Sequence, residues 1–153
     1  MTEPTSGAVV GNEHHLPVRV YYEDTDFSGV VYHASYLRFM ERGRTNYLRL
    51  LGADQRALFE EVAKEAPGFA FVVRSMTIDF RKPARMDDVL EIMTVPLEVK
   101  GASIVLHQRV SRDDELLVEA TVQVAFVSDG RARPIPKALR TAMKAGQALA
   151  GGD

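Results

Sequence analysis

The best-placed chemical groups in this sequence lie in an acidic turn that precedes a helical pattern. The turn, Tyr21–Asp26, reads Tyr-Tyr-Glu-Asp-Thr-Asp; Gly29 and a helical pattern from about His33 follow it. A carboxylate at Asp26 can act as a general base or as a nucleophile. Unpaired backbone N–H groups in the first helical turn can receive an oxyanion. The spacing therefore predicts acyl-transfer chemistry.

Two further carboxylates, Glu23 and Asp24, compete with Asp26 for this role. We expect Asp24 to stabilise the turn through local hydrogen bonds. Its negative charge would raise the pKa of Asp26. Asp26 also has a purely structural interpretation, in which it stabilises the turn or caps the helix.

The elements around the turn must position it. Alternating residues predict a strand over 17–23, and apolar residues at helical spacing predict a helix over 33–51. The expected apolar stripe includes Leu37 and Leu50. Gly43 inside it predicts a close approach by another segment, since glycine is a poor helix former. Gly52 fits the position after the helix end, and Asp54 can cap a second helix that runs to Lys64.

The second half of the chain alternates as strands do. Four strands are predicted, over 69–81, 89–99, 102–111 and 115–127, and a closing helix over 136–148. Val72 of the first strand and Leu116 of the last are assigned to the inward faces. Short turns join the last three strands, which therefore form an antiparallel meander.

This order predicts an α+β fold in which a single antiparallel sheet curls around the long helix. We assign one domain to residues 17–148, a disordered tail to residues 1–16 and a frayed end to residues 149–153. A sheet with an exposed edge tends to pair across a two-fold axis, so we expect a homodimer; the sequence leaves open whether two dimers pair into a tetramer.

Composition excludes several classes of function. The chain has no cysteine, which rules out disulfides and thiolate chemistry and is compatible with a cytoplasmic location. Its net charge of −2 gives no reason to expect nucleic acid as a partner. No apolar run is long enough to predict membrane insertion, and no secretory signal is visible. The pair His14-His15 lies in the expected tail without further ligands, so no metal site is predicted.

Several of these segments together resemble the hotdog-fold thioesterases of the 4-hydroxybenzoyl-CoA thioesterase family. The resemblance rests on Tyr-Tyr-Glu-Asp-Thr-Asp, Gly-Val-Val-Tyr-His and Glu-Arg-Gly-Arg-Thr within residues 21–45, and on residues 78–88. It covers about residues 19–143 and is strongest for the YbgC-type branch, which is associated with the Tol-Pal system. Phe27-Ser28 departs from the small residues usual there, which would narrow the substrate pocket.

The resemblance implies specific roles for residues around the turn. Asp26 would be the catalytic carboxylate, and the backbone N–H of His33 would polarise the thioester oxygen. Gly29 would let the backbone turn toward the thioester. Tyr22 and Tyr32 would line the site or simply pack. Glu41 would reach the acyl group or the acidic loop across a dimer, or form a surface ion pair with a neighbouring arginine.

The implied substrate is an acyl-CoA, with no bound metal or cofactor, since coenzyme A is part of substrate and product. Arg81, Lys82 and Arg85 would hold its phosphates, or would form an ordinary solvated basic loop.

Three alternatives remain open at this stage. The protein could act on an acyl carrier protein, or it could be a non-catalytic acyl-binding or envelope-associated module. Asp24-Thr25-Asp26 after a strand also matches magnesium-dependent phosphatases of the haloacid-dehalogenase type, which require parallel strands.

Overall fold

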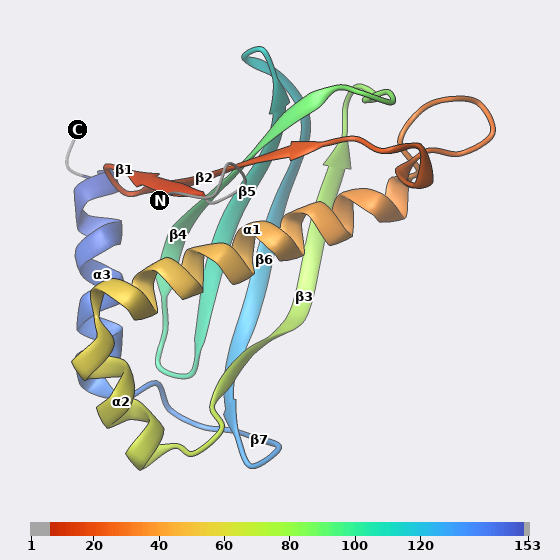
Figure 1. Ribbon diagram of the computed structural model, residues 1–153. Coiled ribbons are helices and arrows are strands. Elements are labelled where there is room, and N and C mark those ends of the chain that lie inside the picture. The colour runs from red at the N-terminus through yellow and green to blue at the C-terminus, as the bar shows by residue number, and fades with distance from the viewer. Residues whose placement is uncertain (1–6, 152–153) are drawn as a thin grey trace.

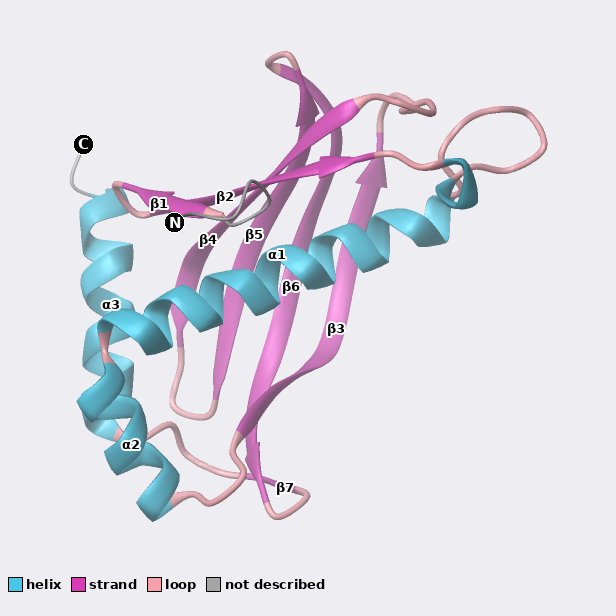
Figure 2. Ribbon diagram, in the orientation of Figure 1, coloured by secondary structure: helices cyan, strands magenta, loops and turns pink. Residues whose placement is uncertain are grey.

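One long helix, α1 (His33–Asp54), lies across a single sheet in the computed structural model, which describes residues 7–151, with side chains up to residue 144 (Figures 1 and 2). A turn of 3₁₀ helix, η1 (Tyr22–Asp24), precedes α1, and α2 (Arg56–Glu65) and α3 (Lys137–Gly151) stand at one end of the sheet. The strands are β1 (Ala8–Val10), β2 (Glu13–Arg19), β3 (Ala70–Phe80), β4 (Val89–Val99), β5 (Ser103–Arg112), β6 (Glu115–Ser128) and β7 (Arg131–Ala132).

The sheet has the strand order β1-β2-β4-β5-β6-β3, and β7 pairs with the end of β6. Every pairing between these strands is antiparallel. The predicted meander is confirmed by β4, β5 and β6. The phosphatase alternative is wrong, because that fold needs parallel strands joined by helices. The expected α+β hotdog arrangement, a sheet around a long helix, is confirmed.

The core lies between α1 and the concave face of the sheet. Phe39 and Met40 are fully buried there, against strand residues such as Val122 and Phe126. The expected stripe is correct in its centre, but Leu37 is exposed. A Cβ atom added to Gly43 would lie 2.9 Å from Cγ2 of Ile92. The close approach predicted from this glycine is therefore confirmed as contact with side chains of the sheet.

The prediction of a disordered tail is wrong for residues 8–16. These residues form β1 and the first part of β2, and β2 pairs with β4 from His14 to Arg19. His14 is fully buried, and its Nε2 lies 2.6 Å from Oδ1 of Asn46 on α1. Two adjacent histidines are typical of a polar tail. Here Asn46 of α1 provides the hydrogen-bond partner that allows His14 to be buried. Residues 1–6 lie outside the described residues.

Other boundaries differ from the prediction for local reasons. The strand ends at Arg19, because the acidic turn coils into η1. Gly52 lies inside α1 instead of after it. A Cβ there would lie 3.1 Å from the Phe59 ring of α2, so this glycine serves the close packing of the two helices. Asp54 is the last residue of α1 and does not cap α2, which begins after Gln55. The closing helix continues to Gly151, beyond the predicted end; residues 152–153 lie outside the description.

Two strand faces were assigned incorrectly because of β-bulges. The register of β3 against β6 shifts between Val73 and Ser75, so Val72 points away from the core and is 45% exposed. A second shift follows Val110 in the pairing of β5 with β6, and it buries Leu117 in place of Leu116. A bulge inserts one residue and reverses the faces on one side of it.

Candidate active site

The acidic loop between η1 and α1 projects from the body of the molecule (Figure 1). Its two stems are joined by a bridge between Thr25 and Val31, and Val30 bridges to Arg85. The N–H of Val31 also donates to the carbonyl of Ala84 at 2.8 Å. Gly29 has φ +86°, a backbone conformation that favours glycine. The predicted turn at Gly29 is thus confirmed, and the loop has a fixed base.

Asp24 is a structural residue of this loop, as predicted. Its side chain is buried; Oδ2 accepts the Tyr21 N–H at 2.8 Å, and Oδ1 lies 3.4 Å from Nη2 of Arg38. Its backbone carbonyl accepts the Ser35 hydroxyl at 3.0 Å and the Tyr32 N–H at 2.9 Å. Asp24 therefore ties the acidic loop to the first turn of α1.

Asp26 is held differently, at the open end of the loop. Its Oδ1 accepts two hydrogen bonds from Ser28, from Oγ at 2.5 Å and from the N–H at 2.9 Å. These bonds lower the pKa of Asp26, the hydroxyl contributing most, because they stabilise the ionised carboxylate. The predicted rise in this pKa is wrong: the carboxylate of Asp24 faces Arg38 and the Tyr21 N–H, and the local donors at Asp26 dominate.

The first turn of α1 offers backbone donors. Its N-cap, Tyr32, makes no capping bond through its side chain, and the Ser35 N–H is already bonded to the Tyr32 carbonyl at 2.8 Å. Within residues 7–151, no acceptor is found for the N–H of His33. The positive end of a helix of 22 residues is therefore available to a developing negative charge.

A cavity of about 250 Å³ opens beside this helix end. It is lined by Val31, His33, Tyr36, Phe80, Arg81, Lys82 and Pro83. The cavity brings together three residues of the predicted site, His33, Arg81 and Lys82. It also includes Tyr36 and Phe80, which lie within the predicted helix over 33–51 and the predicted strand over 69–81 but were not among the predicted site residues. The Tyr36 hydroxyl accepts the Ala84 N–H at 3.0 Å, and burial raises the pKa of Tyr36.

The basic residues of this cavity already have acidic neighbours. Arg81 lies 3.4 Å from Asp79, and Lys82 lies 2.6 Å from Glu115, both measured between charged atoms. Arg85 is outside the cavity lining, and its backbone N–H donates to Asp88. A phosphate bound here would compete with carboxylates for Arg81 and Lys82.

Other predicted site residues lie apart from this cavity within one chain. Glu41 lines a separate groove of about 710 Å³ between β2 and α1, and it forms none of the ion pairs found among the described residues. Tyr22 is 81% exposed. Asp26 and Phe27 are absent from the cavity lining, and Phe27 is fully exposed at the tip of the loop. Phe27 therefore does not narrow this cavity.

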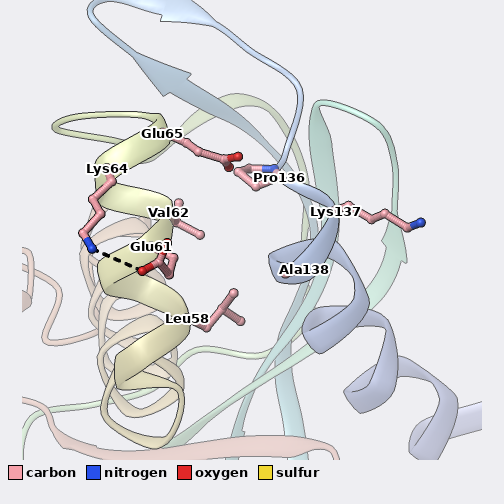
Figure 3. A pocket seen from close by; sticks show the side chains of 8 residues that line it. All are labelled: Leu58, Glu61, Val62, Lys64, Glu65, Pro136, Lys137 and Ala138. Carbon is pink, nitrogen blue, oxygen red and sulfur yellow. Dashed lines mark hydrogen bonds and ion pairs between the residues drawn. The ribbon is translucent and has the colours of Figure 1, made fainter.

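A cavity of about 370 Å³ lies between α2 and the start of α3 (Figure 3). Leu58 and Val62 contribute apolar side chains to it, and Lys64 pairs with Glu61 at 3.2 Å. None of the predicted catalytic residues lines it. Within residues 7–151 no group of three or more His, Asp or Glu residues is arranged to hold a metal ion. No described helix is long and apolar enough to cross a membrane.

Comparisons with known proteins agree with this geometry. The family model of the thioesterase-like superfamily matches residues 20–143. The chain is 47% identical over 136 residues to "Acyl-CoA thioesterase YbgC" of Haemophilus influenzae, which covers 88% of this chain and 96% of that protein. It is 48% identical over 126 residues to "Acyl-CoA thioester hydrolase YbgC" of Escherichia coli O6:H1, which covers 80% of this chain and 90% of that protein.

A crystal structure shows the same fold. The probable thioesterase from Bartonella henselae is 39% identical, has a TM-score of 0.68 and covers 81% of this chain and 98% of its own. The match of the family model extends from Val20, the residue after β2, into α3, and so includes Asp26, the start of α1 and the whole meander. The chain belongs to the thioesterase-like superfamily.

Proposed function

We propose that this protein hydrolyses acyl-CoA thioesters, with Asp26 as the catalytic carboxylate. The observation that carries the proposal is an acidic loop that bears Asp26, with a lowered pKa, and leads into the start of α1, in a chain 47% identical to an acyl-CoA thioesterase over 88% of its length. The acyl-CoA substrate is taken from the printed names of the two YbgC relatives.

Two balanced routes use the same groups. As a general base, Asp26 takes a proton from water, the hydroxide adds to the thioester carbonyl, and the intermediate expels the thiolate of coenzyme A, which regains the proton. As a nucleophile, Asp26 attacks the carbonyl, expels the thiolate of coenzyme A and forms a mixed anhydride. Water then hydrolyses the anhydride, which releases the acid, regenerates the Asp26 carboxylate and supplies the proton that the thiolate takes up. In both routes the N–H of His33 would stabilise the oxyanion, a contribution of about 3 to 4 kcal/mol for one such donor.

We also propose that the site is completed by a second copy of the chain. β3 lies at one end of the sheet, and Val72, Val73 and Phe80 on it are 45%, 48% and 49% exposed. Pairing two β3 edges across a two-fold axis would cover these side chains. The second copy would also place a wall opposite the loop that carries Asp26 and Phe27, where Phe27 is fully exposed within one chain. In this dimer, Glu41 and Tyr22 would reach a given site only from the second copy of the chain.

Arg81 and Lys82 are proposed to contact the phosphates of coenzyme A at the mouth of the cavity. If a phosphate replaced Asp79 and Glu115 as the ion-pair partner of Arg81 and Lys82, both cations would keep a negative neighbour.

Replacing both cations by alanine should raise KM more than it lowers kcat, because contacts far from the reacting bond act on ground and transition states alike. Steady-state kinetics would measure this, and an equal rise in KM with phosphopantetheine thioesters would contradict the phosphate contact.

Hydrolysis of an acyl-CoA panel tests the proposal as a whole. The panel runs from acetyl to palmitoyl, with benzoyl and 4-hydroxybenzoyl, and released thiol is the signal. Turnover by the wild type that is lost in Asp26→Asn supports the proposed enzyme. Wild-type turnover only with thioesters of acyl carrier protein would replace the substrate class, and absence of turnover on both would favour an acyl-binding module.

A further inference from the structure

Ser28 stands next to the proposed catalytic carboxylate and bonds to one of its two oxygens. Oγ and N–H of Ser28 both donate to Oδ1 of Asp26, at 2.5 Å and 2.9 Å. Both of these hydrogen bonds fall on Oδ1, while the backbone N–H groups of Val30 and of Asp26 itself act on the carboxylate more weakly than Ser28 does. The two strongest local donors thus hold Oδ1, which leaves Oδ2 as the oxygen that water or substrate would meet.

The N–H bond is an ordinary feature of a turn that starts at an aspartate. The hydroxyl bond is additional, because it depends on the side chain at position 28. Other constraints on the carboxylate are weaker. Asp26 lies on a projecting loop, its N–H donates to the Val30 carbonyl at 2.9 Å, and the N–H groups of Val30 and Asp26 stabilise the carboxylate less than Ser28 does. The Ser28 side chain is therefore well placed to decide how the carboxylate is rotated.

Charged groups near the loop do not provide this orientation. Glu23 and Asp24 precede Asp26, Arg85 lies on the segment that bridges to Val30, and His33 begins α1. None of these four forms an ion pair with Asp26, and Asp24 is directed to Arg38. The lowered pKa of Asp26 has hydrogen bonds from Ser28 as its largest causes.

We infer that Ser28 is a positioning residue, which fixes the rotation of the Asp26 carboxylate and keeps Oδ2 directed to the reaction. This inference rests on the proposed role of Asp26. It assigns to Ser28 a function that a small residue without a hydroxyl could not perform. A misdirected carboxylate reacts more slowly even when the substrate binds normally.

Three substitutions in the acidic loop test it in the full-length protein. Ser28→Ala removes the hydroxyl and leaves the N–H, Ser28→Thr restores a hydroxyl, and Thr25→Val is a matched control. The control removes a hydroxyl from the same loop that bonds to the Tyr22 carbonyl at 2.7 Å and not to Asp26. For each protein kcat and KM are measured across pH, with thermal unfolding as the check on folding.

Ser28→Ala should lower kcat by about tenfold, leave KM nearly unchanged and move the acid limb of the kcat profile to higher pH. Ser28→Thr should restore the wild-type profile, and Thr25→Val should keep its acid limb unmoved. A Ser28→Ala profile that overlays the wild type would overturn the inference. So would an equal displacement in Thr25→Val, which would indicate general loosening of the loop.

The pKa of Asp26 can also be measured directly, without relying on turnover at low pH. The carboxyl carbon of Asp26 can be titrated by NMR in ¹³C-aspartate-labelled protein and assigned by its loss in Asp26→Asn. Its midpoint should rise in Ser28→Ala and return in Ser28→Thr; an unchanged midpoint would overturn the inference. If Asp26→Asn retains turnover, the proposed function itself fails. If Asp26→Asn is inactive and Ser28→Ala is normal, only the role of Ser28 fails.

Discussion

Asp26 and His14 both have lowered pKa values, for opposite physical reasons. Asp26 is ionised more easily than an ordinary aspartate because Ser28 donates hydrogen bonds to its charged form. His14 is protonated less easily than an ordinary histidine because burial penalises its charged form. The first effect concerns the proposed reaction, and the second concerns the stability of the fold.

His14 should make the folded protein less stable in mild acid. Its pKa is lower when folded than when unfolded, so its contribution is fully present above the unfolded value of about 6.5 and is lost as the pH falls below it. Nε2 faces Asn46, and Nδ1 is buried without a partner among the described atoms. Chemical unfolding between pH 8 and 5 should show a smaller loss for His14→Gln than for the wild type; equal losses would exclude His14 as the cause.

Sequence reasoning succeeded at single residues where the signal is local. Gly29 was identified from the turn it must make, and Asp24 was expected to stabilise the turn through local hydrogen bonds, as it does. It failed where a distant residue decides the role. His14 depends on Asn46, 32 positions later, and Tyr36 meets the candidate cavity only because the chain returns at Pro83.

At the scale of elements, the close packing of α1 against the sheet depends on Gly43. A Cβ there would lie 2.9 Å from Ile92 and 3.3 Å from Oγ1 of Thr94. Gly43→Ala should therefore lower stability by about 1 to 3 kcal/mol through overpacking, despite the better helix propensity of alanine. Thermal unfolding would measure this, with Thr45→Ala on the exposed side of α1 as the control. A stabilised Gly43→Ala would show that α1 can move away from the sheet.

The strands show which parts of the sheet can be predicted from hydrophobic periodicity. β4 was predicted with its observed bounds, because alternation and flanking turns mark both ends. β1 and the first half of β2 were missed, since their burial comes from α1 and β4. The bulges in β3 and β6 place Val72 and Leu116 on the faces opposite to those predicted. No local residue pattern indicates such an insertion.

At the scale of the whole molecule, the exposed edge at β3 determines whether the site is complete. Val73→Lys would place a charge on this edge twice in a two-fold pair, and should weaken self-association by about tenfold or more. Sedimentation velocity at several concentrations would show the shift to monomer, accompanied by loss of activity. Thr121→Lys, on β6 one strand from the edge, is the matched control. A monomer with full activity would contradict the proposed shared site.

Hydrolysis of acyl-CoA by the wild type and by Asp26→Asn, side by side, tests the central proposal most directly. Asparagine has nearly the same shape and cannot act as a base or stable nucleophile, so folding and unfolding temperature should be retained. The kcat value should fall by about a hundredfold or more. A folded Asp26→Asn protein with undiminished kcat would contradict the assignment of Asp26 as the catalytic carboxylate.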